Sequence, residues 1–149
     1  HAEFWCQARP ETYKLPIGTH VISAGTTPPM PDAEFFVYEA AKYPEACLLL
    51  RNLKLLIATD SVQYWAEWSY TTFLTRCVLQ VMGFKLTLLI GGPWLKRVTP
   101  KGGSLVADFQ RLLRLDFDHV VGAHGQLLHD AAKPMLEAAI AKALPESKR

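Results

Sequence analysis

The chain has 149 residues, half of them apolar and a fifth charged, which fits one globular domain and excludes a largely disordered protein. Its formal net charge is +2, from 16 Lys and Arg against 14 Asp and Glu, so no nucleic acid or anionic membrane is expected as a partner. No apolar run approaches the ~20 residues that span a bilayer, and widely spaced Cys6, Cys47 and Cys77 predict buried, reduced thiols in a cytoplasmic protein.

The first part of the chain is predicted to form mostly strands. Residues 1–15 are predicted as a short helix or loop, and the β-branched residues of 19–24 predict a strand that leads into a turn-rich loop at 25–32. The alternating aromatic residues of 33–40 predict a half-buried strand. Two apolar runs, 46–52 and 53–60, flank a polar turn and predict a β-hairpin.

After Asp60 the pattern changes towards helices. Residues 61–70 are aromatic without a clear preference, and 71–83 have helical spacing with Gly83 as the stop. Residues 84–103 predict an apolar segment followed by a Gly/Pro-rich loop, and Ser104 is the expected N-cap of a helix over 104–115. A buried strand and glycine loop (117–125), an amphipathic helix (130–144) and a polar tail (145–149) follow. This order predicts a layered α/β or α+β domain.

Asp60 and His124 are the candidate metal ligands, because each directly follows a short apolar strand. Ligands of layered α/β proteins bind where loops leave the carboxyl ends of strands, and a carboxylate with an imidazole suits Zn²⁺ or a similar cation. The alternative is that Asp60 caps a turn and that His124 bonds only to main chain.

Two segments resemble the metallo-β-lactamase-like hydrolases. LLIATDSVQYW (55–65) is similar to the strand and turn that carry this family's metal-bridging aspartate, and LVADFQRLLRLDFDHVVGAHGQLL (105–128) resembles the helix, strand and loop that carry its last histidine ligand. The resemblance covers 19–144 and the later part of such a domain. It implies one half of an αββα fold, with a mixed sheet covered by helices, in a single domain over 1–149 that lacks its N-terminal part if the chain is a fragment.

By this resemblance, Asp60 would bridge two metals and His124 would be the terminal ligand of zinc or another divalent cation. The family uses metal-activated water against ester, amide, thioester or phosphoester bonds, which implies a small-molecule substrate. The family's HxHxDH signature is absent from the chain, and Thr26 stands where the turn should supply a histidine. Since a hydroxyl is a poor zinc ligand, the expected metal site is incomplete.

Three further residues could lie near the site. His129 follows His124 on the exit loop and could approach the same crevice, while Tyr64 and Trp65 could line a pocket rim. The alternative for the aromatic residues is that they cover the sheet as core.

Three hypotheses remain open from the sequence. The chain is a metal-dependent hydrolase of unknown substrate, a non-catalytic relative that serves binding or assembly, or a fragment of a longer enzyme. A fragment would expose apolar surface that favours a homodimer. No motif identifies the substrate.

Overall fold

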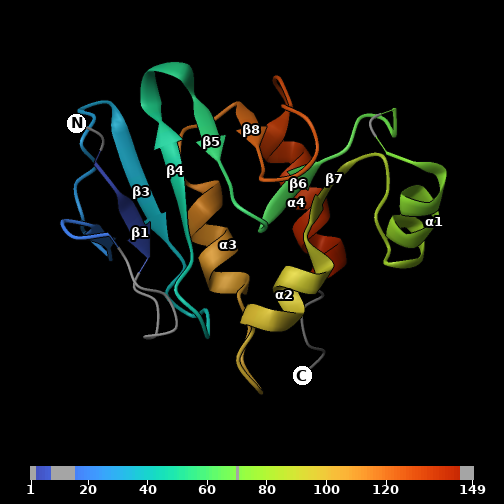
Figure 1. Cartoon of the computed structure of the whole chain (residues 1–149), viewed down its shortest axis with the longest axis horizontal. Helices are drawn as coiled ribbons and strands as arrows, with labels where there is room; N and C mark the ends of the chain where they lie inside the picture. The colour runs from blue at the N-terminus through green and yellow to red at the C-terminus, as the bar shows by residue number, and fades with distance from the viewer. Residues whose placement is uncertain (1–2, 8–15, 70, 145–149) are drawn as a thin grey trace.

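The computed structural model describes residues 3–7, 16–69 and 71–144. These residues form a mixed α+β protein with four α-helices, in agreement with the predicted class (Figure 1). The strands are β1 (Trp5–Gln7), β2 (His20–Ile22), β3 (Ala33–Val37), β4 (Ala46–Leu50), β5 (Leu55–Ile57), β6 (Val62–Tyr64), β7 (Leu88–Ile90) and β8 (His119–Val121). The helices are α1 (Phe73–Val81), α2 (Gly92–Val98), α3 (Val106–Leu113) and α4 (Ala132–Ala143).

The main sheet has four strands in the order β3-β4-β5-β8. β4 and β5 form the predicted hairpin, with Leu50 opposite Leu55. A single 3₁₀ turn, Arg51–Leu53, connects them, and Lys54 closes it in a left-handed conformation with φ of 45°. β8 joins the other side of β5 in a parallel arrangement. The sheet is therefore mixed, and its last pairing joins segments that are far apart in the sequence.

The two faces of the main sheet differ in burial. One face carries Phe36, Leu49, Leu56 and Val120, which are buried in one core with residues of α3 and α4. Because side chains alternate along a strand, the neighbours of these residues point to the opposite face. That second face is also apolar, with Phe35, Leu48, Ile57 and Val121, but it is only partly covered.

A second, two-stranded sheet lies beside the end of the first. β6 and β7 are antiparallel, with Val62 opposite Ile90, and α4 packs against β7. One parallel bridge between Tyr64 and Gly125 connects β6 with the loop after β8. The connection brings the segment after β5 against the segment after β8.

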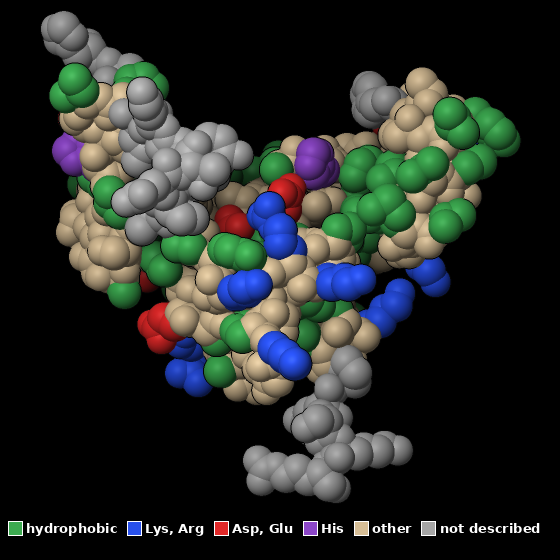
Figure 2. Space-filling model, turned by 60° about the horizontal axis from the view of Figure 1, so that its bottom comes forward, with side chains coloured by type: hydrophobic (Ala, Val, Ile, Leu, Met, Phe, Trp, Pro, Cys, Tyr) green, Lys and Arg blue, Asp and Glu red, His purple; other side chains and the backbone are tan. Residues whose placement is uncertain are grey.

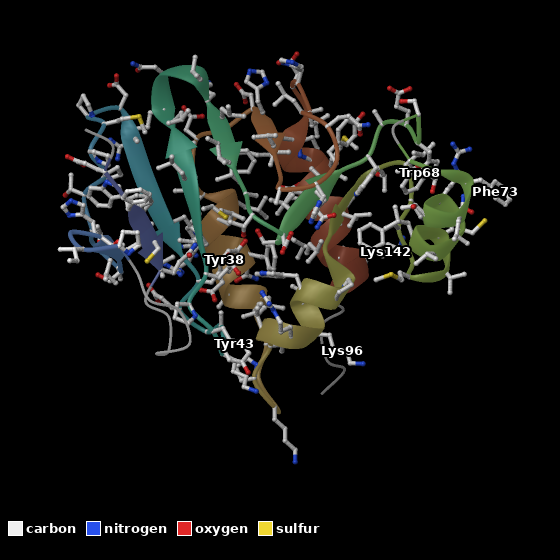
Figure 3. The ribbon with its side chains drawn as sticks, in the orientation of Figure 1. Tyr38, Tyr43, Trp68, Phe73, Lys96 and Lys142 are labelled. Atoms are coloured by element: carbon white, nitrogen blue, oxygen red, sulfur yellow. The ribbon has the colours of Figure 1, made fainter. Side chains whose placement is uncertain are left out.

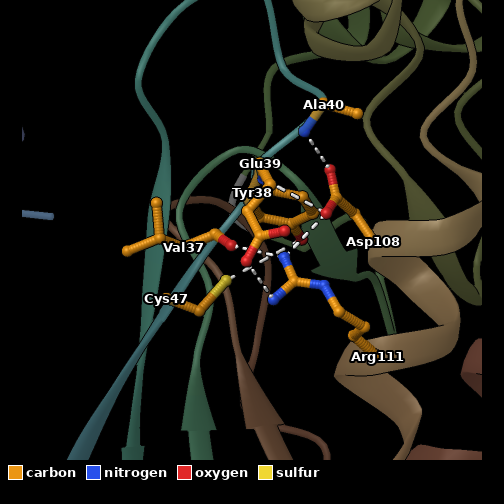
Figure 4. Close-up of polar contacts among 7 residues, drawn as sticks. All are labelled: Val37, Tyr38, Glu39, Ala40, Cys47, Asp108 and Arg111. Atoms are coloured by element: carbon orange, nitrogen blue, oxygen red, sulfur yellow. Dashed lines mark hydrogen bonds and ion pairs between the residues drawn. The ribbon is translucent and has the colours of Figure 1, made fainter. Parts of the chain in front are cut away.

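A buried carboxylate ties α3 to the end of β3. Asp108 is 2 % exposed and accepts hydrogen bonds from the main-chain nitrogens of Glu39 (3.1 Å) and Ala40 (2.9 Å) (Figure 4). Arg111, one turn further along α3, donates to Asp108 (2.7 Å) and to the carbonyl oxygen of Val37 (2.8 Å). These partners satisfy the buried charge, since an unpaired one would be costly.

Two regions differ from the expected elements. Trp5–Gln7 forms a strand parallel to β2, where a helix or loop was predicted, because its main chain pairs with the β-branched segment at His20–Ile22. The predicted loop after Gly91 is instead α2, since proline is tolerated in the first turn of a helix, where its missing N–H has no partner to lose. Residues 8–15 and the tail 145–149 lie outside the described residues.

The other predicted helices are present. α3 begins after Leu105, so the prediction of Ser104 as the N-cap is wrong by one residue, although the Ser104 hydroxyl accepts a hydrogen bond from Val106 N (3.2 Å). α4 lies within 130–144 as expected. The three cysteines are free, but only Cys47 is buried, so the prediction of three buried thiols is wrong for Cys6 and Cys77.

α1 forms where the sequence predicts it, but it does not join the core. Thr72 caps its start, and Gly83, with φ of 88°, follows its end. None of its residues is buried, and Phe73 and Val81 are 79 % and 88 % exposed. Figures 1 and 3 show the helix at the margin of the molecule, with Phe73 directed outwards. The helical pattern therefore predicts the helix but not its environment.

Within the described ranges, no helix combines the length and the apolar character needed to cross a membrane.

Candidate functional site

Asp60 and His124 lie side by side at one end of the main sheet. A main-chain hydrogen bond from Ala123 N to Thr59 O (3.0 Å) continues the parallel pairing of β5 and β8 beyond both strands. The next residues along the two segments are Asp60 and His124, whose Oδ1 and Nε2 atoms are 3.3 Å apart. Both side chains are open to solvent, 45 % and 62 % exposed. The structure thus brings together the two residues that follow strands.

Three glycines let the main chain pass close to this pair. A Cβ on Gly91 would meet the main-chain oxygen of Asp60, and a Cβ on Gly125 would meet that of Tyr64. Gly122 makes a similar approach to the first residue of β6. Gly125 also has φ of 90°, a conformation that disfavours other residues. Gly91, Gly122 and Gly125 therefore have a packing role at the candidate site.

Glu45, which directly precedes β4, connects two segments beside the candidate site. Its two carboxylate oxygens accept hydrogen bonds from the Thr59 hydroxyl (2.7 Å) and from the Trp94 indole nitrogen (3.0 Å). Gln63, which is 4 % exposed, donates its side-chain amide to the main-chain oxygen of Asp60 (3.2 Å). Both contacts reduce the freedom of the segment that carries Asp60.

A hollow of about 280 Å³ opens over the pair. Figure 2 shows this face hollowed, with histidine, acidic and basic side chains near one another. Asp60 and His124 provide one part of the lining, and Arg97 adds a cation. The complete lining is Asp60, Gln63, Phe84, Pro93, Trp94, Arg97 and His124. The hollow therefore combines a negative and a positive side chain with an apolar wall.

A larger hollow of about 370 Å³ lies between α4 and β7, and neither Asp60 nor His124 lines it.

A buried polar group lies directly behind Asp60. Ser61 is fully buried, and its hydroxyl lies 3.8 Å from the thiol of Cys47, which itself lies 3.8 Å from the Tyr38 hydroxyl. Burial raises the pKa of Cys47 from 9.0 to about 11, and burial also raises the pKa of Tyr38 well above 10.0. Both groups therefore stay neutral near pH 7, and neither supplies a ready nucleophile.

Tyr64 and Trp65 support the site without lining the hollow. Trp65 donates its indole N–H to the side-chain amide oxygen Oε1 of Gln63 (3.4 Å), and its ring centroid lies 6.0 Å from that of Phe84. Tyr64 acts through its main chain, which accepts a hydrogen bond from Gln126 N (2.7 Å) and so holds the loop after β8. Tyr64 and Trp65 therefore lie behind the residues that line the hollow, rather than at the expected pocket rim.

Thr26 and His129 are not among the residues that line the hollow. The Thr26 hydroxyl accepts a hydrogen bond from Ser23 N (2.9 Å) within its own turn. The His129 ring lies 5.4 Å from that of His119, the first residue of β8, whereas His124 follows the opposite end of this strand. The chain reverses after His124, since Leu128 pairs back with Val120 and carries His129 away from the pair.

The geometry of Asp60 and His124 can be compared with a metal site. Zinc that binds tetrahedrally at about 2.1 Å holds neighbouring ligand atoms about 3.4 Å apart. The observed 3.3 Å between Oδ1 and Nε2 fits one edge of such a tetrahedron, and it also fits a direct ion pair, which requires a protonated His124. Among the described residues, no third His, Cys, Asp or Glu completes a metal-binding group. The pair therefore fits two ligand positions, fewer than the three protein ligands of typical catalytic zinc sites.

The sequence interpretation missed Glu45, Gln63 and Arg97. Arg97 was placed in a loop, so its position on a helix beside the hollow was not foreseen. Glu45 contacts residues from β5 and α2, and no local pattern marks such a distant partner. Only Gln63 had a local indication in the sequence. The alternation in SVQYW is typical of a short strand, and Gln63 lies three residues after the predicted ligand Asp60.

Neither a scan of the sequence against protein-family models nor a search of the curated proteins found a match.

Proposed function

We propose that this chain carries the later half of a metallo-β-lactamase-like hydrolase fold and binds a divalent metal, with Asp60 and His124 as two of its ligands. The observation that carries the proposal is the parallel pairing of β5 and β8, which holds Asp60 Oδ1 and His124 Nε2 at 3.3 Å. A carboxylate and an imidazole at the carboxyl ends of adjacent strands form a plausible start of a zinc site.

The layering of the main sheet supports the same proposal. An αββα fold packs two sheets face to face, each covered by helices on its outer side. The main sheet has α3 and α4 on one face and an apolar, partly exposed second face that includes Phe35, Leu48 and Ile57. This is the arrangement expected of one half of such a fold, because the second face would pack against the other sheet.

Each part of the hollow has a role in this proposal. A bound divalent cation would supply Lewis-acid activation of water and would polarise a carbonyl or phosphoryl group. Asp60 and His124 would hold the cation, and Gln63 and Glu45 would fix the segments on either side of Asp60. The apolar wall would exclude water from one side of the substrate, which strengthens electrostatic interactions there.

Metal titration of the complete chain tests the proposal. After treatment with chelator and dialysis, calorimetry with ZnCl₂ should detect binding that Asp60→Asn and His124→Ala each weaken by about tenfold or more. His129→Ala is the matched control, because it removes an exposed imidazole next to His119 rather than at the pair. Equal binding by wild type and His124→Ala, or no binding by wild type, would refute the metal site.

A non-catalytic relative is the second candidate. The described residues offer two ligands, and the Thr26 hydroxyl is engaged within its own turn. This candidate predicts no stoichiometric metal, and it predicts that Asp60 and His124 only form an ion pair with each other. The exposed pair would then contribute at most about 1 kcal/mol to stability, so His124→Ala should fold normally.

A further inference from the structure

Arg97 is an exposed cation in the hollow that already holds Asp60 and His124. It lies in the last turn of α2, and its side chain forms part of the lining of the hollow. Among the described residues, no carboxylate oxygen lies within 4.0 Å of its guanidinium, although Asp60 lines the same hollow. The donors of Arg97 are therefore available to a ligand.

Further cations lie on and near α2, the helix that carries Arg97. Lys96 precedes Arg97 in α2, and Lys101 follows shortly after this helix. Lys42 lies beside the end of α2, because its main-chain nitrogen donates to Val98 O (2.7 Å). All three lysines are exposed, and the described part of the chain offers none of them an ion pair. Figure 2 shows basic side chains gathered on this face, which concentrates positive potential there although the net charge is only +2.

The remaining wall of the hollow is apolar. Phe84, Pro93 and Trp94 line it, and the Glu45 carboxylate fixes the Trp94 ring through its indole N–H (3.0 Å). Trp94 packs against the buried rings of Tyr38 and Phe109, so this part of the wall belongs to the hydrophobic core. An apolar wall with a few placed polar groups is typical of sites for small molecules.

We propose that the substrate of this site carries a carboxylate or phosphate group attached to an apolar body, and that Arg97 binds the anionic group. A guanidinium presents paired N–H donors that match both anions, which makes Arg97 the specificity-determining residue. The apolar body would lie against Phe84 and Trp94, with the bond to be cleaved near Asp60 and His124. This inference rests on the proposed hydrolase function, because it names the substrate class of the same site.

Anion titration of the metal-free chain tests the role of Arg97 separately. In the presence of chelator, phosphate, phenyl phosphate, acetate and benzoate are titrated while NMR follows the Arg97 Nε–H and Trp94 Nε1–H signals. Both signals should shift saturably, and the aryl-bearing anion of each pair should bind more tightly than the plain one. Arg97→Gln should weaken binding by about tenfold, the loss expected for one charge-assisted hydrogen-bonding group.

Lys96→Gln is the matched control, since it removes one charge from the same helical turn but not from the lining of the hollow. Figure 3 shows Lys96 directed away beneath α2. An equal loss of anion affinity in Arg97→Gln and Lys96→Gln would overturn the assignment. It would indicate that the overall positive potential of this face, rather than a contact with Arg97, attracts the anion. Absence of saturable shifts, or no gain from the aryl group, would also overturn it. Comparison of the phosphate and carboxylate arms identifies the anion. Because no metal is present, failure here leaves the result of the zinc titration untouched.

Discussion

Cys47 illustrates how a single buried residue makes stability depend on pH. Its folded pKa is about 11 against an ordinary 9.0, because burial disfavours the thiolate. As the pH rises, the unfolded chain therefore loses this proton first. The contribution of the neutral thiol to the free energy of unfolding is fully present below about pH 9 and declines until the pH passes about 11. Two pKa units correspond to about 3 kcal/mol.

Urea unfolding at several pH values between about 9 and 11 should show this decline in wild type and a shallower one in Cys47→Ala. Tyr38 is present in both proteins, but Cys47 contributes to its raised pKa, so the difference reports the thiol together with its coupling to Tyr38. Cys77→Ala removes a partly exposed thiol and should keep the wild-type slope. Parallel curves for wild type and Cys47→Ala would show that the thiol does not titrate as its burial implies.

Individual site residues were predictable only where local pattern and position coincide. Asp60 and His124 each end a short apolar run, and parallel neighbours carry such residues to the same edge. Glu45 and Arg97 could not be predicted in the same way, since their roles depend on contacts between segments that are distant in sequence.

At the scale of elements, α1 contributes a helix but little burial. Phe73→Ser and Val81→Ser, separately or together, should change the free energy of unfolding by less than about 0.5 kcal/mol, as usual for exposed positions. Leu112→Ala in α3 removes a fully buried side chain and should cost about 2–5 kcal/mol. Urea unfolding compares the two cases. A comparable loss in the α1 variants would mean that this face is covered in solution, as it would be in a homodimer.

Elements with strong local signals were predicted correctly, and elements that depend on context were not. The β4–β5 hairpin follows from two apolar runs around a polar turn, and α3 and α4 follow from their apolar period. The loop predicted in place of α2 was wrong. Gly91, Gly92 and Pro93 favour a loop locally, whereas the burial of Trp94 and Val98 stabilises the helix. β6 was not predicted, because its three residues form a strand only by pairing with β7.

At the scale of the whole molecule, Gly125 connects the loop after β8 of the main sheet with β6 of the β6–β7 sheet. A Cβ there would meet the Tyr64 main chain and would also occupy a left-handed conformation with φ of 90°. Gly125→Ala should therefore lose about 1–3 kcal/mol more stability than Gly83→Ala, which has φ of 88° but open space around it. Thermal unfolding of both variants measures the difference, and equal losses would show that only backbone conformation matters.

The mixed class of the fold was predictable from the order of strands and helices, but the division into sheets was not. The chain order of β5, β6, β7 and β8 gives no indication that β8 pairs with β5 while β6 and β7 pair with each other. That choice depends on which apolar faces can be buried together by α3 and α4.

The pairing of β5 with β8 also affects how the protein is made. β8 begins at His119, so β5 has been synthesised long before its parallel neighbour exists. Until then, Leu55–Ile57 presents an unsatisfied strand edge to other chains. Contacts of such long sequence separation also slow folding, because a large loop must close before they form. The strand that later holds Asp60 beside His124 is therefore open to association with other chains until β8 has been made.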